Sequence, residues 1–160
     1  MFTNTSLLRV SVLAASLAFG GCAMLPGGTA EPAPQAKSTA SADTAVFSAT
    51  LSAAAEVPPN SSMANGKLDA TLDKKTSVLR WKLTYSGLTG PATMVHFHAP
   101  AMPGANAGVV LPFPSAASGV NAEGTLTPAQ VTDLMAGKWY VNVHTAANPG
   151  GEIRGQLVVR

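Results

Sequence analysis

The chain has 160 residues, of which 11% are charged, and its formal net charge is +2. This length has room for one ordinary domain, because most domains contain about 100–150 residues. The one run of basic residues is the pair Lys74-Lys75, so a nucleic acid is not an expected partner. The single cysteine, Cys22, excludes a disulfide bond within the chain.

The first 22 residues have the pattern of an export signal. The apolar segment at residues 10–19 is about half as long as the roughly 20 residues that a membrane-spanning helix needs. Gly-Gly-Cys follows at residues 20–22, which resembles the lipobox of bacterial lipoproteins, with Phe19 standing where that motif usually has an aliphatic residue. We therefore predict a lipoprotein signal peptide over residues 1–22 that ends at a lipidated Cys22.

Residues 23–45 are rich in Ala, Pro, Ser, Thr and Gly. Such a segment cannot bury enough apolar surface to offset its ordering entropy, which predicts a flexible tether. Ala23 after the cysteine resembles an outer-membrane address, so we expect a lipid-anchored protein of the cell envelope, in the outer membrane of a Gram-negative host. Two other interpretations remain open. Cleavage after Ala23 gives a periplasmic or secreted protein, and Cys22 could also be a buried cysteine of a core helix.

Period-two alternation of apolar and polar residues begins at Val46. It predicts strands over residues 46–52, 67–73, 79–85, 93–98, 108–113, 138–144 and 152–159. The segments 67–73 and 79–85 alternate most cleanly on either side of a polar turn, which indicates a hairpin with one buried and one solvated face. The segment 99–107 is rich in Pro and Gly and is expected to be a surface loop.

One helix is expected after Thr127. Thr127 and Gln130 have the spacing of a capping box, and Pro128 suits the first helical position. Val131, Leu134 and Met135 would share one face, and Gly137 would end the helix. About seven short strands and one short helix predict an all-β fold, a Greek-key sandwich or barrel over residues 46–160.

The three histidines of the chain are candidate metal ligands. His96 and His98 lie on one face of a predicted strand, and His144 shares a face with Tyr140 and Asn142 on another. We expect the three imidazoles to form one cluster. Neutral imidazoles suit copper or zinc, and Met94 and Met102 could add a soft ligand for Cu(I). In the alternative interpretation, the histidines only hydrogen-bond to backbone carbonyls or to Glu152.

Glu152, Arg154 and Gln156 share one face of the last predicted strand. Glu152 and Arg154 form either a structural ion pair or a second shell around the metal, in which Arg154 attracts an anion. Gly155 would let another backbone approach closely. The sequence has no G-x-S-x-G elbow and no glycine-rich phosphate loop, so an enzyme is not expected.

Several motifs resemble the chordin-repeat (CHRD) domain over essentially all of residues 46–160. They are Glu56-Val-Pro-Pro59, Tyr85-Ser-Gly-Leu88, His96-Phe-His98, Gly108-Val-Val110, Tyr140-Val-Asn-Val-His-Thr145 and Asn148-Pro-Gly-Gly-Glu-Ile-Arg-Gly-Gln156. The resemblance implies an immunoglobulin-like β-barrel and an extracytoplasmic location. It does not imply binding of a growth factor.

The histidine pattern is also similar to that of copper–zinc superoxide dismutase, a Greek-key barrel. That likeness implies His96, His98 and His144 as copper ligands and Arg154 as an anion-guiding arginine. The sequence departs from that family because it has no bridging fourth histidine, no zinc loop and no disulfide.

The functional expectation follows from the tether and the absence of a complete catalytic set. We expect a non-enzymatic module of the cell envelope that binds an unidentified protein or ligand through its loops. The alternative is a metalloprotein with a three-histidine copper or zinc site.

Overall fold

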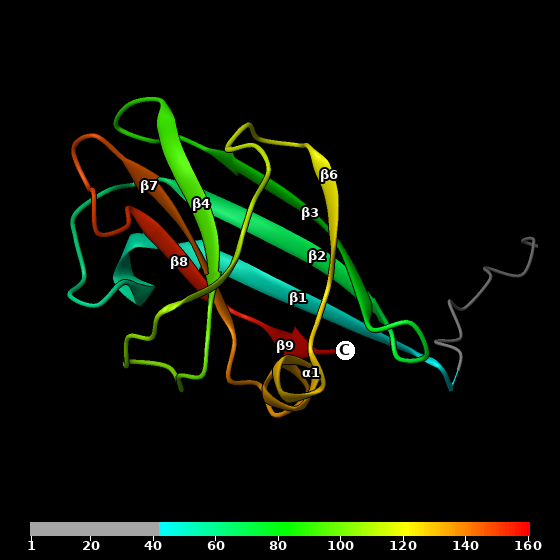
Figure 1. The fold of residues 1–160 in the computed structure, drawn as a ribbon. Coiled ribbons are helices and arrows are strands. Elements are labelled where there is room, and N and C mark those ends of the chain that lie inside the picture. Colours follow the sequence, from blue (N-terminus) through cyan, green and yellow to red (C-terminus); the bar gives the residue numbers. More distant parts are fainter. Residues whose placement is uncertain (1–41) are drawn as a thin grey trace, which may run out of the picture. The chain divides into compact units, whose positions relative to one another are not determined.

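The computed structural model describes residues 42–160, which form an antiparallel, nearly closed barrel with one short α-helix (Figure 1). The expected all-β class is confirmed. The signal peptide with Cys22 lies outside the described residues, as does most of the expected tether. Within residues 42–160, no helix has the length and apolarity to cross a membrane.

The strands form one sheet in the order β5-β4-β7-β8-β1-β2-β3-β6, with β9 paired to β1. The elements are β1 (Thr44–Ser52), the 3-10 turn η1 (Ala53–Ala55), β2 (Asn65–Asp73), β3 (Val78–Ser86), β4 (Ala92–His98), β5 (Val109–Pro112), β6 (Asn121–Thr125), α1 (Pro128–Met135), β7 (Tyr140–Thr145), β8 (Ile153–Gln156) and β9 (Val158–Val159). The N-terminal strand therefore lies in the middle of the sheet, beside the C-terminal strands.

The hairpin of β2 and β3 follows directly from the alternation. Leu68 pairs with Leu83, and Leu72 pairs with Leu79, in a register without interruption. These four leucines are buried, whereas the intervening polar residues are mostly exposed. The turn between the strands is stabilised by the Asp73 carboxylate, which accepts hydrogen bonds from the backbone amides of Lys75 and Thr76.

An aromatic cluster fills the centre of the barrel. The Phe97 ring lies 5.1 Å from Trp81 in a T-shaped contact, 4.8 Å from Phe113 and 5.6 Å from Trp139. Trp81 comes from β3, Phe97 from β4 and Trp139 from the residue before β7. The cluster therefore joins strands from the two halves of the sheet across the barrel. Its T-shaped contact is one of the arrangements that aromatic rings prefer.

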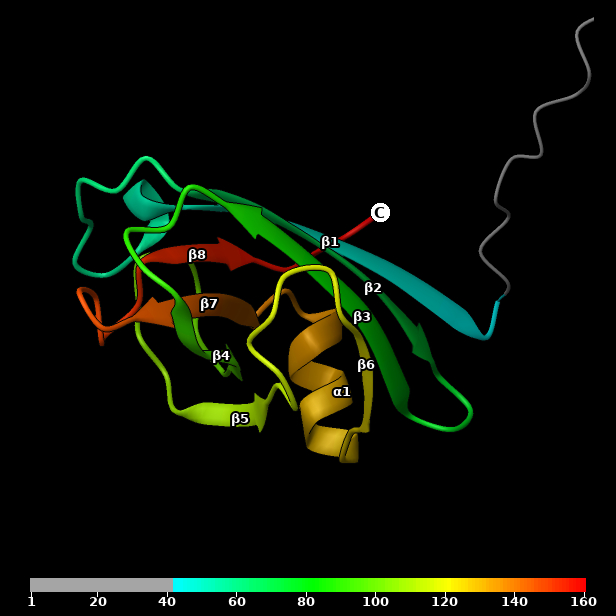
Figure 2. The same ribbon diagram turned by 90° about the horizontal axis from the view of Figure 1, so that it is seen from above.

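The helix α1 lies on the open side of the barrel, between the edge strands β5 and β6 in the view from above (Figure 2). The predicted capping box is confirmed, with Thr127 as N-cap and Gln130 at N3. Gln130 also donates to the Val110 carbonyl oxygen, which connects α1 to β5. Leu134 is fully buried, whereas Met135 is 41% exposed, so the face that these two residues share is buried only in part.

Residues 42–160 form nine strands where about seven were expected. Residues 121–125 form β6, which was not predicted, and the last predicted strand is divided into β8 and β9 at the buried Leu157. β1 begins at Thr44, two residues before the expected start of the domain. The division at Leu157 lets β8 pair with β7 and β9 pair with β1.

Both faces of β7 are buried, although antiparallel sheets commonly leave one face in contact with solvent. All six residues of β7 are buried, including Asn142 and His144. The segments 53–64 and 99–108 cover the outward face, and both make side-chain hydrogen bonds to β8 or to the residue before it. One end of the barrel therefore contains an enclosed layer of polar side chains.

Gly155 in β8 allows β1 to approach, as the sequence indicated. A Cβ atom at this position would lie 2.6 Å from the Thr50 carbonyl oxygen. We expect Gly155→Ala to lower the free energy of unfolding by about 1–3 kcal/mol, the usual cost of overpacking. Urea unfolding measures this change.

The matched control is Gly150→Ala, since a Cβ atom there meets nothing within 4 Å. The control should change the free energy of unfolding by no more than about 0.5 kcal/mol. Equal effects of the two substitutions would contradict the proposed contact with Thr50.

Candidate metal centre

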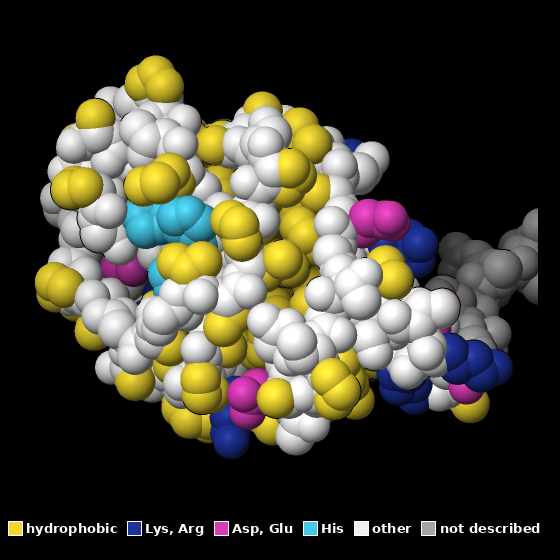
Figure 3. Space-filling model, in the orientation of Figure 1, with side chains coloured by type: hydrophobic (Ala, Val, Ile, Leu, Met, Phe, Trp, Pro, Cys, Tyr) yellow, Lys and Arg dark blue, Asp and Glu magenta, His cyan; other side chains and the backbone are white. Residues whose placement is uncertain are grey.

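The three histidines come from two neighbouring strands. In β4, Val95 and Phe97 point into the core, so His96 and His98 lie on the opposite face. In β7, the same alternation places His144 opposite the core residue Val143. The histidine side chains gather at one place on the surface view, with apolar side chains around them (Figure 3).

The three imidazoles form a compact group. Each histidine offers one nitrogen, and these three atoms all lie within 4.8 Å of one another. The closest pair is His96 Nδ1 and His144 Nε2, at 3.3 Å. Two nitrogens that each lie about 2.0–2.1 Å from a tetrahedral metal ion are about 3.3 Å apart, so this pair already has the spacing of two ligands. The expected cluster is confirmed.

Backbone carbonyls fix the orientation of the two buried rings. His98 Nδ1 lies 2.9 Å from the Ala107 carbonyl oxygen, and His144 Nδ1 lies 3.0 Å from the Pro149 carbonyl oxygen. A carbonyl oxygen can only accept, so both Nδ1 atoms carry the hydrogen. In the neutral His144 ring, the lone pair is then on Nε2, which is the arrangement that outer-shell carbonyls impose on metal-binding histidines.

The environment favours the neutral form of two of these rings. Burial lowers the pKa of His96 below its usual value, and the neighbouring histidines lower it further. Burial also lowers the pKa of His144, against a smaller opposite effect of the Pro149 carbonyl. Both imidazoles are therefore neutral at pH 7, which is the state that binds a metal ion.

Asn142 connects the histidines to the rest of the polar layer. Its Oδ1 lies 3.0 Å from His98 Nε2, and its amide group donates to the Gly150 carbonyl oxygen. A metal ion bound to His98 Nε2 would replace the contact with Asn142. The sequence placed Asn142 on the histidine face but did not indicate this contact.

The Tyr140 ring stacks against the His98 ring. The two rings are parallel, with centroids 4.7 Å apart, and the Arg154 guanidinium lies 3.4 Å from the centre of the Tyr140 ring. Arg154 also donates to Asn106 and to the Ala105 carbonyl oxygen. The described contacts of Arg154 thus hold the segment 99–108 over the site, and its role beside a metal or an anion stays a prediction.

Glu152 has a different set of partners from Arg154. Its carboxylate accepts hydrogen bonds from the Thr145 and Ser62 hydroxyls and from both the hydroxyl and the backbone amide of Thr89. Burial alone would raise the pKa of Glu152, but these hydrogen bonds together lower it to about 2. Glu152 is therefore ionised and connects three chain segments by hydrogen bonds. Its role in a second shell around a metal ion stays a prediction.

Glu56 is a buried carboxyl group that the sequence did not single out as a site residue. It is 5% exposed and lies against Asn142 and Gly151. A Cβ atom at position 151 would collide with the Glu56 carboxyl group. Burial raises its pKa to about 7, and the positive charge of Arg154 offsets part of this rise. The one available signal was a carboxylate within an otherwise apolar segment, Ala54-Ala-Glu-Val-Pro58.

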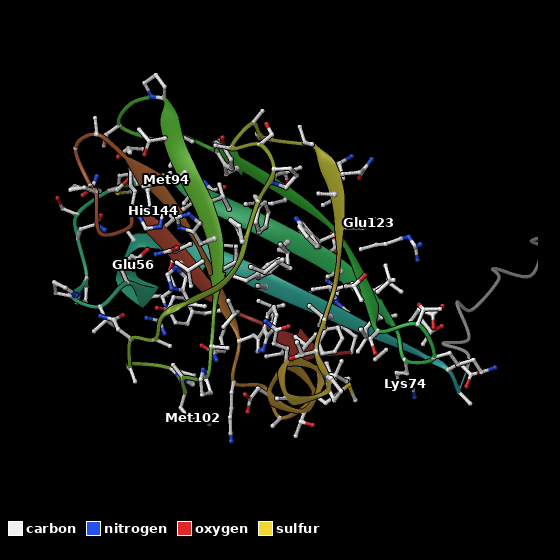
Figure 4. All side chains as sticks on the ribbon, in the orientation of Figure 1. Glu56, Lys74, Met94, Met102, Glu123 and His144 are labelled. Carbon is white, nitrogen blue, oxygen red and sulfur yellow. The ribbon has the colours of Figure 1, made fainter. Side chains whose placement is uncertain are left out.

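The two methionines that were considered as soft ligands lie in different places (Figure 4). Met94 pairs with His144 across β4 and β7. Met102 belongs to the covering segment 99–108 and is 58% exposed.

The fold defines a small antiparallel β-barrel domain with one polar strand face enclosed by loops. A family model of the CHRD domain matches residues 47–157, and the chain therefore belongs to the CHRD-domain family. A search of curated proteins and a search of solved structures each found no match. The family match confirms the resemblance seen in the motifs. The lipid anchor and the likeness to copper–zinc superoxide dismutase stay predictions.

The raised pKa of Glu56 predicts a dependence of stability on pH. Between about pH 4.5 and pH 7, the folded protein holds a proton on Glu56 that the unfolded chain has released. The free energy of unfolding therefore falls as the pH rises through this window. We expect Glu56→Gln to remove this loss, so that the variant gains on the order of 2–3 kcal/mol relative to wild type between pH 4.5 and pH 8.

Urea unfolding of both proteins across this pH range measures the difference in their free energies of unfolding. The contribution of the histidines cancels in this difference because both proteins contain them. Glu123→Gln is the control, because the Glu123 carboxylate is exposed and pairs with Arg80 on the outside of the sheet. Parallel pH profiles of wild type and Glu56→Gln would show that Glu56 titrates normally.

Proposed function

We propose that this CHRD domain is a metal-binding module of the cell envelope that holds copper or zinc through His96, His98 and His144. The observation that carries the proposal is the placement of the three ligand nitrogens within 4.8 Å of one another. Imidazole nitrogen suits both metals. The proposed role is binding rather than catalysis, because the sequence offers no recognisable nucleophile or phosphate loop.

Metal binding at His98 requires a local rearrangement. Binding through Nε2 requires this atom to exchange the Asn142 oxygen for the metal ion, and an amide oxygen can only accept a hydrogen bond. The Asn142 side chain therefore has to turn away when a metal ion binds at this nitrogen. The cost is confined to one buried contact and is on the order of 1–3 kcal/mol.

Removal of one ligand tests the proposal. We expect the full chain, purified without a polyhistidine tag, to bind one equivalent of Cu(II) or Zn(II). His98→Ala and His144→Ala should each weaken binding by at least about 10–100-fold, since even the loss of an outer-shell contact has that effect. Elemental analysis and titration calorimetry measure the stoichiometry and the affinity.

Lys82→Ala is a control for weak binding at the surface, because Lys82 is an exposed residue of β3. Added metal should raise the melting temperature of wild type and of this control, but not of the histidine variants, since a ligand stabilises the state that binds it. Metal binding that is unchanged in both histidine variants would refute the site.

The proposed location in the envelope rests on the N-terminal sequence. Cys22 directly follows the apolar segment and is the only cysteine of the chain, which favours lipid attachment over a structural role. We expect Cys22→Ser to move the protein from the membrane fraction to the soluble fraction after export. The lipid chains would provide the membrane affinity that the substitution removes.

Cell fractionation and immunoblotting measure this change, with Ser41→Ala as a control that leaves Cys22 in place. A Cys22→Ser variant that is normally processed and still sediments with the membrane would contradict lipid anchoring. Neither outcome affects the histidine site.

A further inference from the structure

Met94 carries a thioether on the same strand face as the histidines. Residues 94, 96 and 98 alternate with the core residues Val95 and Phe97, which are 3% and 0% exposed. Met94 itself is 48% exposed. Met94 is thus an exposed thioether on the strand face that carries His96 and His98, and its position is set by the regular alternation of β4.

The register of the sheet places Met94 directly opposite His144. Met94 belongs to the same uninterrupted register as Val95 and His96. The irregularity between β4 and β7 lies before Met94, at Thr93. Directly opposite residues have Cβ atoms about 4.5–5.5 Å apart. Met94 and His144 are labelled beside each other in Figure 4. The three rotatable bonds of a methionine side chain allow its sulfur to turn toward the His144 ring.

We propose that Met94 is the fourth ligand of the histidine site and that it makes the site a Cu(I) site. This inference rests on the proposed function and specifies the metal. Zinc in proteins is bound by cysteine, histidine and carboxylate ligands, whereas a soft thioether favours Cu(I). Three imidazoles alone suit either metal, so the thioether is the ligand that distinguishes between them.

The burial of the ligands agrees with this arrangement. His98 and His144 are 8% and 6% exposed, so the site is closed on their side, and His96 is only partly buried. His96 and Met94 are more exposed than His98 and His144, so the proposed fourth ligand position is on their side of the group. The other described methionines, Met63, Met102 and Met135, lie outside the strands that carry the histidines.

The test compares Cu(I) with Zn(II). Cu(I) affinity of the full chain is measured by competition with a chromophoric Cu(I) chelator, without oxygen and with a reductant, and Zn(II) affinity is measured by calorimetry. We expect Met94→Leu to weaken Cu(I) binding by about tenfold or more, because even outer-shell losses cost that much. Zn(II) binding should not change.

Met63→Leu is the matched control, since Met63 is 91% exposed and lies in the segment before β2. It should leave both affinities unchanged. Met94 is half exposed, so neither substitution should lower the melting temperature. A second measurement, X-ray absorption of the Cu(I) protein, should show one sulfur in the first coordination shell that is lost in Met94→Leu.

Two results overturn the inference. Equal Cu(I) affinity of wild type and Met94→Leu, or a Cu(I) shell of nitrogen alone, would remove Met94 from the site and leave the three-histidine site intact. Absence of Cu(I), Cu(II) and Zn(II) binding to wild type would overturn the proposed function, and the inference with it.

Discussion

The enclosed polar end of the barrel depends on the carboxylate of Glu152. This group is fully buried, and an ionised carboxylate is stable in such a place only when hydrogen bonds replace its water. Ser62, Thr89 and Thr145 supply them from three separate segments. Thr145 ends β7, so the same contacts fix the start of the turn whose Pro149 carbonyl holds His144.

The histidines are thereby positioned by their surroundings as well as by their own strands. Strand geometry determines which face they share, and the carbonyls of Ala107 and Pro149 determine how each buried ring is turned. Such support from outside the ligand shell is what precise binding sites require. A site on a bare strand face would have the same residues without the fixed orientation.

Alternation along the strands was sufficient to predict the β2–β3 hairpin, the core face of β4 and β7, and the grouping of the histidines. It was not sufficient for β6, where Ala122 and Gly124 occupy inward positions with no apolar signal. Gly124 is small because Leu111 and Trp81 fill that space, at 3.2 Å and 3.5 Å from where a Cβ would stand. The covering loops and buried Glu56 were also missed, because long-range contacts determine them and no local period encodes them.

The direction of β1 has a consequence for how the domain is presented. Ser52 lies in one hydrogen-bonded row with Arg154, Asn142 and His96, whereas Thr44 pairs with Asp73 at the opposite end of the sheet. Nine residues of strand separate these ends by about 25–30 Å. The described chain enters the barrel at Thr44, so the histidines lie at the end of the sheet remote from this entry. A segment that joins the domain through Thr44 therefore joins it at the end of the sheet away from the histidines.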